Sequence, residues 1–456
     1  MKSRQSSENR KSHCFWLLIA FFVLVFLTGG SSRSDVASLM VLRPVSIFVC
    51  GLGMWSLRRE HFKQHQNLFI FAALMLGLVV LYLIPLPFAI WMSLPGHTLV
   101  EHIDSAAILR GVHRPAAINP VAGFDTLFWF CTPMAVLILG AQLGQKERAL
   151  LLFVIMGLTL LSGFVGLAQL LGDSAGDLYF YRVTNNGSSV GLFANRNHQA
   201  IMLAMIFPML VVFANRSAGQ NLIVRKWIAF SSALFIVPLL LVTGSRAGVF
   251  AGIFGVAAAA VVYHRSQPAS EKRPAFITQM SQITLAIAAI VSLGVVTNFF
   301  SRAVAIDRML NDGAQESRLD FWKPVIAMTQ HYLPIGTGPG GFADAYRVIE
   351  PVSLLDSTYL NRAHNDWLET IAEFGLLGAV LLASVVAWAT ILGVKAFTDS
   401  HKGQNNLFAC LGFVIIMISA IGSAGDYPLR TPAIAAVTML AAIWLSSRTM
   451  PQKTVI

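Results

Sequence analysis

The chain has 456 residues, of which 55% are hydrophobic and only 12% are charged, and its mean hydropathy is +0.66. This composition excludes a soluble globular protein and predicts an all-α polytopic membrane protein, a single integral-membrane domain over residues 1–456. The net charge of +11 does not indicate a nucleic-acid partner, because the basic residues are spread over many short loops. The four cysteines lack CxxC spacing, so neither a disulfide framework nor a zinc site is expected.

Twelve apolar segments are long enough to cross a bilayer. In chain order they fall near residues 14–30, 37–57, 67–90, 123–141, 149–171, 197–214, 225–242, 246–263, 278–298, 366–394, 406–423 and 431–447. The first also has the basic and apolar regions of a signal peptide, but no A-x-A cleavage site follows, so we treat it as a span. An even number of spans places both termini on one side, and the basic N-terminus predicts that this side is the cytoplasm.

The basic residues differ in kind between the two predicted sides. The cytoplasmic side holds 9 Lys and 10 Arg, whereas the outer side holds 13 Arg and one lysine, Lys323. Positive-inside topology does not require this bias. Because the planar guanidinium of arginine binds two phosphate oxygens at once and an ammonium does not, one interpretation is an outer pyrophosphate site. The other is a compositional bias toward arginine.

Two predicted outer loops are long enough to carry structure. Residues 91–122 are expected to form a short interfacial helix and a polar turn. The larger periplasmic loop, residues 299–365, lies between spans nine and ten and carries the candidate catalytic elements. Within it, the amphipathic stretch Leu319 to Leu333 predicts a helix on the membrane surface, with Pro324 in its first turn.

A glycine-rich segment, Gly336 to Phe342, follows this stretch. No GK[ST] element and no βαβ pattern accompany it, so it is not a nucleotide-binding motif. Two interpretations stay open: a set of tight turns, or a close approach of the backbone to a substrate, in which Gly338 and Gly340 would take part.

Three outer arginines are candidate ligands of a diphosphate. Arg246 lies in a short turn between two spans, Arg196 opens another span beside Asn195 and His198, and Arg318 opens the amphipathic stretch. Each also has a simpler interpretation. Arg246 would be a snorkelling anchor at the membrane boundary, and Arg318 would be an exposed loop charge. At Arg196, the polar cluster would serve only to start the span, with Asn195 as its helix cap.

The most specific motif begins at His364 and Asn365, where the chain re-enters the membrane. It reads H-N-x9-G-x-x-G and ends at Gly378. Asp366 is the expected N-cap, with Glu369 completing a capping box, and His364 at this place is a candidate general base. Glu373, nine residues beyond His364, is expected either to pair with an outer arginine or to shape the path of an acceptor.

The outer loops show no paired carboxylates and no His/Cys spacing typical of a metal site, so we expect neither a metal nor another cofactor. An alternative to an enzyme is a small-anion transporter. A transporter would need a charged pathway across the membrane, and few intramembrane charges other than Glu373 support one.

These motifs resemble the O-antigen ligase family, which also includes related polysaccharide polymerases. The resemblance covers roughly residues 190–380 by motif and the whole chain by topology. It rests on GLFANRNHQA (191–200), TGSRAG (243–248), the segment from Arg318 to Phe342 that ends GTGPGGF, and HNDWLETIAEFGLLG (364–378). It implies a metal-independent, inverting glycosyltransferase of the bacterial inner membrane, with its active site on the periplasmic face.

The resemblance also implies substrates and residue roles. The donor would be a glycan on undecaprenyl diphosphate, and the acceptor a lipid A–core sugar in a ligase or another lipid-linked glycan in a polymerase; the motifs do not separate these two. His364 would take the proton of the acceptor hydroxyl, while arginines would hold the diphosphate. The residues implied are His364 as base, Arg246, Arg318 and Arg196 at the diphosphate, and Asn365, Glu373, His198, Gly338 and Gly340 in support.

Overall fold

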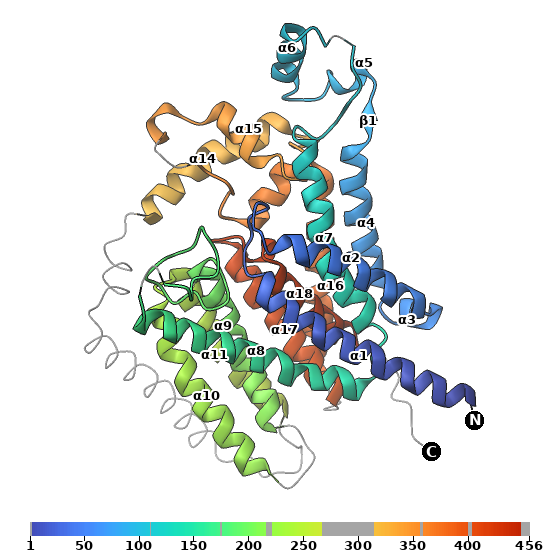
Figure 1. Ribbon diagram of the computed structural model, residues 1–456, viewed down its shortest axis with the longest axis vertical. Helices are drawn as coiled ribbons and strands as arrows, with labels where there is room; N and C mark the ends of the chain where they lie inside the picture. The colour runs from blue at the N-terminus through green and yellow to red at the C-terminus, as the bar shows by residue number, and fades with distance from the viewer. Residues whose placement is uncertain are drawn as a thin grey trace.

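The computed structural model describes residues 2–109, 111–173, 176–215, 221–266, 314–355, 359–399 and 404–447, without the side chains of residues 2–12 and 314–320. Eleven of the twelve predicted spans fall in these ranges, and each is a helix (Figure 1). They are α1 (Lys2–Thr28), α2 (Leu39–Ser56), α4 (Gln66–Leu83), α7 (Pro120–Gly140), α8 (Gln145–Leu171), α9 (Arg196–Asn215), α10 (Leu222–Val242), α11 (Arg246–Ser266), α16 (Asp366–Thr398), α17 (Gln404–Ser423) and α18 (Pro432–Ser446). The predicted span 278–298 lies outside the described residues.

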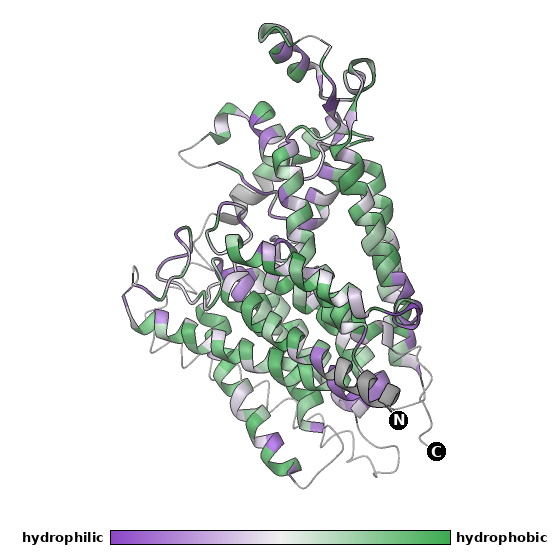
Figure 2. Ribbon diagram, turned by 45° about the vertical axis from the view of Figure 1, so that its right-hand side comes forward, coloured by the Kyte–Doolittle hydropathy of each residue, from purple (hydrophilic) through white to green (hydrophobic). Residues whose placement is uncertain are grey.

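Within the described residues, nine helices are long and apolar enough to cross a membrane: α2, α4, α7, α8, α9, α10, α11, α16 and α17. His13–Thr28 in α1 and the whole of α18 are shorter apolar helices. Hydrophobic residues dominate these helices, and hydrophilic residues gather in the loops and at helix ends (Figure 2). The chain is therefore a mostly helical, multi-pass membrane protein, and the total of twelve spans stays a prediction.

The span predicted to end near residue 90 stops earlier. α4 ends at Leu83, and the next residues form β1 (Pro85–Leu86), which pairs antiparallel with β2 (Arg114–Pro115). Pro85 and Pro87 explain the difference, because a proline disfavours the helical conformation at the preceding residue and its own nitrogen has no hydrogen to donate. Between the two strands lie α5 (Phe88–Trp91) and α6 (Thr98–Ala106), the short helix expected in this loop, and they project from one end of the molecule (Figure 1). A short α3 (Arg59–Gln64) precedes α4.

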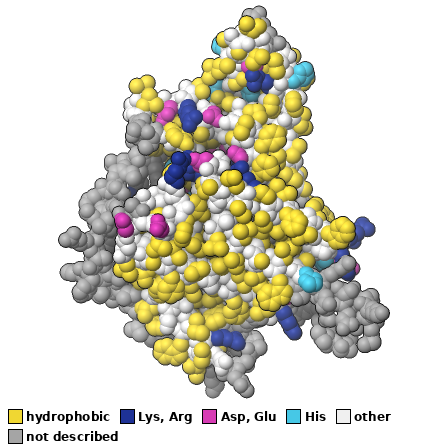
Figure 3. All heavy atoms as spheres, viewed as in Figure 1, with side chains coloured by type: hydrophobic (Ala, Val, Ile, Leu, Met, Phe, Trp, Pro, Cys, Tyr) yellow, Lys and Arg dark blue, Asp and Glu magenta, His cyan; other side chains and the backbone are white. Residues whose placement is uncertain are grey.

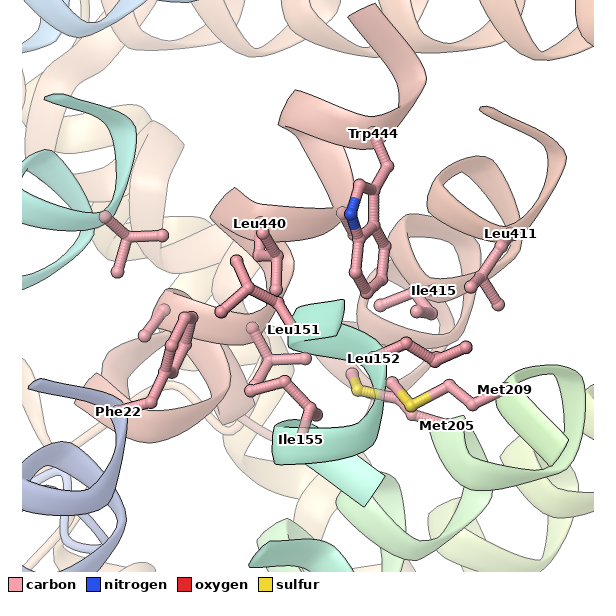
Figure 4. Close-up of a cluster of buried hydrophobic side chains, with 14 of the residues drawn as sticks. Phe22, Leu151, Leu152, Ile155, Met205, Met209, Leu411, Ile415, Leu440 and Trp444 are labelled. Atoms are coloured by element: carbon pink, nitrogen blue, oxygen red, sulfur yellow. The ribbon is translucent and has the colours of Figure 1, made fainter. Parts of the chain in front are cut away.

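The centre of the bundle is α9, which is buried along nearly its whole length. Apolar side chains from α1, α8, α9, α17 and α18 interdigitate beside it (Figure 4): Phe22, Leu151, Leu152, Ile155, Met205, Met209, Leu411, Ile415, Leu440 and Trp444. In a membrane such packing, rather than removal of apolar surface from water, holds helices together.

Small residues let α9 and α11 approach closely. A Cβ added at Gly255 of α11 would lie 2.7 Å from the carbonyl oxygen of Ala204, and one at Gly248 would overlap the Cβ of Ala200. This is the small-residue packing typical of membrane helices. It fixes the start of α11, where Arg246 lies, next to the start of α9.

The large outer loop forms a layer on one end of the bundle (Figure 1). It contains α14 (Ala314–Tyr332), α15 (Phe342–Ile349) and the 3-10 turn η1 (Val352–Leu354). Val325 and Met328 of α14 are buried in a cluster with Phe342 and Tyr346 of α15. The predicted amphipathic helix exists, but these apolar residues pack on protein instead of lying on a membrane surface.

The prediction that Pro324 lies in the first turn of this helix is wrong, because the helix begins at Ala314, ten residues earlier. The first residues of α14, Ala314 to Arg318, are polar and favour helices. A polar start of this kind is not visible in the spacing of apolar residues, which begins only at Leu319.

Candidate active site

Helix α16 is broken one third of the way along, at Gly375. Its backbone has φ 57° and ψ −145°, a conformation that is essentially restricted to glycine. A Cβ added there would overlap the carbonyl oxygens of Pro334 and Ile335. The glycine of the H-N-x9-G-x-x-G motif therefore permits both the break and the close approach of the glycine-rich segment.

The glycine-rich segment replaces the helical hydrogen bonds that the break removes. In an unbroken helix Leu376 would donate to the carbonyl of Ala372, but here it donates to Pro334 (N···O 2.9 Å). Thr337 and Gly338 instead donate to the carbonyls of Ala372 and Glu373, each at 2.9 Å. Backbone groups at membrane depth need such internal partners, since lipid supplies none.

The glycines approach protein backbone. Gly336, Gly338 and Gly340 all have positive φ, at 93°, 81° and 73°. A Cβ at Gly338 would lie 2.5 Å from the Cα of Ala117, and one at Gly340 would lie 2.6 Å from the Cβ of Ala122. These distances favour the interpretation as tight turns that dock on neighbouring helices.

Asn365, and not the predicted Asp366, caps α16. Its side-chain oxygen accepts from the amide of Leu368 at 3.0 Å. Glu369 closes no capping box, because its carboxylate accepts from the amide of Ala363 at 2.9 Å and from the guanidinium of Arg362 at 2.8 Å. Asn and Asp are equally good caps, so the choice depends on the backbone that precedes them.

His364 has a left-handed backbone, with φ 49°. A non-glycine residue in this region is uncommon and persists where its surroundings hold it. Ala363 is held by Glu369, and Asn365 donates from its side chain to the carbonyl of Ala424 at 3.1 Å. Both neighbours of His364 are thus anchored, and its side chain is 27% exposed.

The ring of His364 faces the loop between α17 and α18. Its Nδ1 lies 3.8 Å from Oδ1 of Asp426, and its ring centroid lies 5.0 Å from that of Tyr427. This separation is too long for a hydrogen bond but close enough for strong electrostatic coupling in a buried place. In the described part of the chain, neither ring nitrogen has a hydrogen-bond partner, and Nδ1 is buried.

A second imidazole approaches the same carboxylate. His198 of α9 has Nε2 3.8 Å from Oδ1 of Asp426 and Nδ1 2.8 Å from the hydroxyl of Thr431. Asn197 donates to the other carboxylate oxygen of Asp426, and the amide of Tyr427 donates to Oδ1 at 2.8 Å. Burial alone would raise the pKa of Asp426, but the two histidines hold it well below its ordinary value.

The candidate diphosphate arginines divide into two that can be placed and one that cannot. Arg246 begins α11, and the Cβ of the next residue, Ala247, is 3.9 Å from the Cβ position of Gly425. Arg196 begins α9, directly before Asn197, and its amide donates to the side chain of Asn185 at 3.0 Å. Both helix starts therefore lie beside the loop that carries Asp426, while the Arg318 side chain lies outside the described residues.

Asn195 caps α9, as one interpretation predicted, because its side chain accepts from the amide of Asn197 at 2.8 Å. This cap orients the first turn of α9 so that Asn197 and His198 both turn toward Asp426.

A separate charged cluster ties the first three turns of α16 to the segment before α18. Arg430, in the 3-10 turn η2 (Pro428–Arg430), contacts Glu373 at 2.8 Å, Glu369 at 3.3 Å and Asp366 at 3.7 Å. Arg362 adds a second cation, 2.8 Å from Glu369. Burial alone would lower the pKa of Arg430, but the three carboxylates raise it above its ordinary value.

Glu373 joins this cluster to the glycine-rich segment. One carboxylate oxygen takes the guanidinium of Arg430 and the other accepts from the amide of Gly340 at 3.0 Å. The structure thus pairs Glu373 with arginines, as the first of the two roles expected of it requires.

A cavity of about 560 Å³ lies between α2, α4, α7, α15 and α16. Its wall includes Arg362 and Asp366, two residues before and after His364, but His364 itself turns away toward Asp426. Around this region, basic and acidic side chains gather on one face, between the α14–α15 layer and the bundle (Figure 3).

Sequence reasoning missed Asp426 and Arg430. Both lie in the segment GDYPLRTP, a polar, proline-bounded turn between two apolar spans. An acid and an arginine at a membrane boundary are the signal that could have found them. Among the residues that the structure describes, no three His, Cys, Asp or Glu side chains gather as a metal site.

A bundle of membrane-spanning helices that holds a histidine–carboxylate cluster at one end defines a multi-pass membrane protein with a candidate acid–base site. Residues 231–383, which contain Arg246, Arg318 and His364, match the sequence model of a family described as O-antigen ligase. This segment of the chain is therefore similar to that family, in agreement with the resemblance seen in the sequence. The family implies a glycosyltransferase-like enzyme of the ligase or polymerase kind, embedded in a membrane and acting on lipid-linked glycans.

The comparison with curated proteins gives no match. The matched segment does not include Arg196, His198, Asp426 or Arg430; Asp426 and Arg430 are assigned from their geometry alone.

Proposed function

We propose that the protein transfers a glycan from undecaprenyl diphosphate to a lipid A–core sugar at the periplasmic face of the inner membrane, as an O-antigen ligase. The observation that carries this proposal is the placement of His364. Its Nδ1 faces Asp426 at 3.8 Å, while its partly exposed ring offers Nε2 to a substrate. Such an orientation suits a general base that is positioned by a carboxylate.

In the proposed reaction the acceptor hydroxyl attacks the anomeric carbon of the donor sugar from the face opposite the diphosphate. The new glycosidic bond forms as the bond to the diphosphate oxygen breaks, and the leaving oxygen takes the electron pair. The hydroxyl proton passes to Nε2 of His364. Asp426 then stabilises the imidazolium, as the carboxylate does in a catalytic triad, and the proton is later lost to water.

The charge that builds on the leaving diphosphate needs cations. Arg246 and Arg196 open two closely packed helices beside the Asp426 loop, and we assign them this role together with Arg318. Bidentate guanidinium contacts would stabilise the departing diphosphate more than the bound donor, which lowers the barrier. His198 and Asn197 hold Asp426, and Asn365 holds the backbone of His364. The reaction as proposed uses no metal.

Transfer in reconstituted vesicles tests this proposal. The protein is supplied with a glycan on undecaprenyl diphosphate and with lipid A–core as acceptor. Glycosylated lipid A–core, with inverted anomeric configuration, is the expected product. Longer lipid-linked glycans in place of that product would identify a polymerase, and no transfer to either acceptor would overturn the proposal.

Sidedness is tested separately by labelling single cysteines in a cysteine-free variant. Ser353→Cys lies in η1 on the proposed periplasmic side, and Ser266→Cys ends α11 on the proposed cytoplasmic side. An impermeant maleimide added to spheroplasts should label position 353 and not 266. The reverse pattern would place the site where lipid-linked glycans are not presented.

A further inference from the structure

The cavity between α2, α4, α7, α15 and α16 is polar at one end and apolar at the other. Arg33, Arg43 and Asp125 line it near the outer ends of the helices. Leu382 and Val385, more than fifteen residues into α16, line its apolar end together with Met75 and Val79 of α4. A space of this kind fits an amphiphile whose head lies at the membrane surface and whose chain lies among the helices.

The charges that line the cavity are paired within the protein. Arg33 binds Asp35 through two hydrogen bonds of 2.8 Å, and Arg43 contacts Asp125 at 2.8 Å. Arg347 is the fifth arginine of the wall beside Arg362 and Arg430, and it lies 3.5 Å from Asp344.

Because every arginine of this wall already contacts a carboxylate, the cavity offers many hydrogen-bonding groups without an excess of positive charge. A diphosphate would meet the carboxylates of Asp35, Asp125, Asp344 and Asp366. Sugar hydroxyls, which both donate and accept, suit such a surface, and the aromatic faces of Trp129 and Tyr359 add apolar contact area.

We propose that this cavity binds a second lipid, one with an uncharged glycan head. The lipid is chemically distinct from the diphosphate-linked donor. The site does not depend on the proposed glycan transfer, because His364 faces Asp426 and is not part of the cavity wall.

Photolabelling measures binding without relying on activity. The probe is a diglucosyl-diacylglycerol with a diazirine in one acyl chain, added to the whole protein in lipid nanodiscs. Labelled peptides should fall within residues 39–43, 75–79, 122–132 and 381–385. Unlabelled glycolipid should compete, and undecaprenyl diphosphate should not.

Two variants and one control sharpen the test. Leu382→Trp fills the apolar end and should weaken probe binding about tenfold, or about 1.4 kcal/mol, whereas Val386→Trp, on the same helix but outside the cavity wall, should leave it unchanged. Asp125→Asn removes the partner of Arg43, so the cavity gains positive charge and undecaprenyl diphosphate should begin to compete.

The proposal would be overturned if Leu382→Trp left the labelling unchanged. It would also be overturned if undecaprenyl diphosphate competed as well as the glycolipid in the unaltered protein. If the probe labels the cavity but no glycan is transferred, the proposed function fails and the glycolipid site remains.

Discussion

Two charged clusters lie beside the start of α16, and they use their charges in opposite ways. Around Arg430, two guanidinium groups and three carboxylates satisfy one another at distances down to 2.8 Å. Around Asp426, two imidazoles approach one carboxylate oxygen at 3.8 Å, and each has a buried ring nitrogen without a hydrogen-bond partner in the described part of the chain. Satisfied networks hold a fold together, whereas unsatisfied buried groups call for a functional explanation. The difference distinguishes the cluster around Arg430, which holds the fold together, from the proposed reaction centre around Asp426, four residues earlier in the chain.

Replacing His364 should have the largest effect on catalysis. We expect His364→Ala to lower the transfer rate by about 10³-fold, the loss typical of a general base, with an unchanged unfolding temperature. His331→Ala is the matched control, because His331 is an exposed histidine of α14 in the same outer layer. Near-normal transfer by His364→Ala would assign the chemistry to another group.

Breaking the Arg430 cluster should instead affect stability. Arg430→Gln leaves three buried carboxylates without their shared cation, and we expect a loss of about 3–5 kcal/mol in the free energy of unfolding. The control is Arg182→Gln, since the Arg182 side chain is 88% exposed. If Arg430→Gln unfolds normally but loses transfer, Arg430 belongs to the reaction centre and the comparison above is wrong.

Arginine-to-lysine changes probe the diphosphate assignment. Arg246→Lys and Arg318→Lys should each lower transfer by about 10–100-fold, because an ammonium cannot make the bidentate contact. Arg182→Lys should be neutral. If both lysine variants retain most activity, these residues are general surface charges.

Acid should weaken the Asp426 cluster. Its pKa is held below the ordinary value, so the stability it contributes is present above about pH 3.9 and is lost as the pH falls below that value toward the lowered pKa. We expect a loss on the order of 1 kcal/mol there, which Asp426→Asn should reduce. Unfolding measured between pH 7 and pH 3 tests this, and an identical acid slope in both proteins would contradict it.

Chelation should have the smallest effect. Because the proposed reaction uses a histidine base and arginines at the diphosphate, EDTA should leave the transfer rate unchanged. A rate that falls with EDTA and returns with Mg²⁺ or Mn²⁺ would exclude the metal-free reaction.

Sequence alone predicts the bundle well, because spans are set by local hydrophobic length. Eleven of the twelve predicted segments are helices, and α4 departs only where Pro85 and Pro87 stop it. The start of α16 was misassigned by one residue. Asn365 and Asp366 have nearly equal capping strength, and the left-handed backbone of His364 that decides between them depends on contacts with the α17–α18 loop.

The candidate site was predicted only in part, because it also depends on contacts between segments far apart in the chain. His364, His198 and Arg246 could be selected from polar positions at span ends, and the fold brings the first two to one carboxylate. Asp426 and Arg430 could not be connected to them, since they lie about sixty residues from His364 along the chain. The sequence of the glycine-rich segment could not show whether it docks on protein backbone or approaches a substrate, because both arrangements favour glycines.

The break at Gly375 also bears on how the chain enters the membrane. At the end of the outer third of α16, the carbonyls of Ala372 and Glu373 accept from the glycine-rich segment and not from the helix, so this third is fully satisfied in lipid only when that segment is docked. Its partners, Pro334 to Gly338, precede it in the sequence, and in the proposed topology they cross the bilayer before it. In that topology the last step in forming this helix is the docking of a translocated loop, so we expect a chain with Gly375→Ala to stall there, inserted but open to protease at residues 334–341.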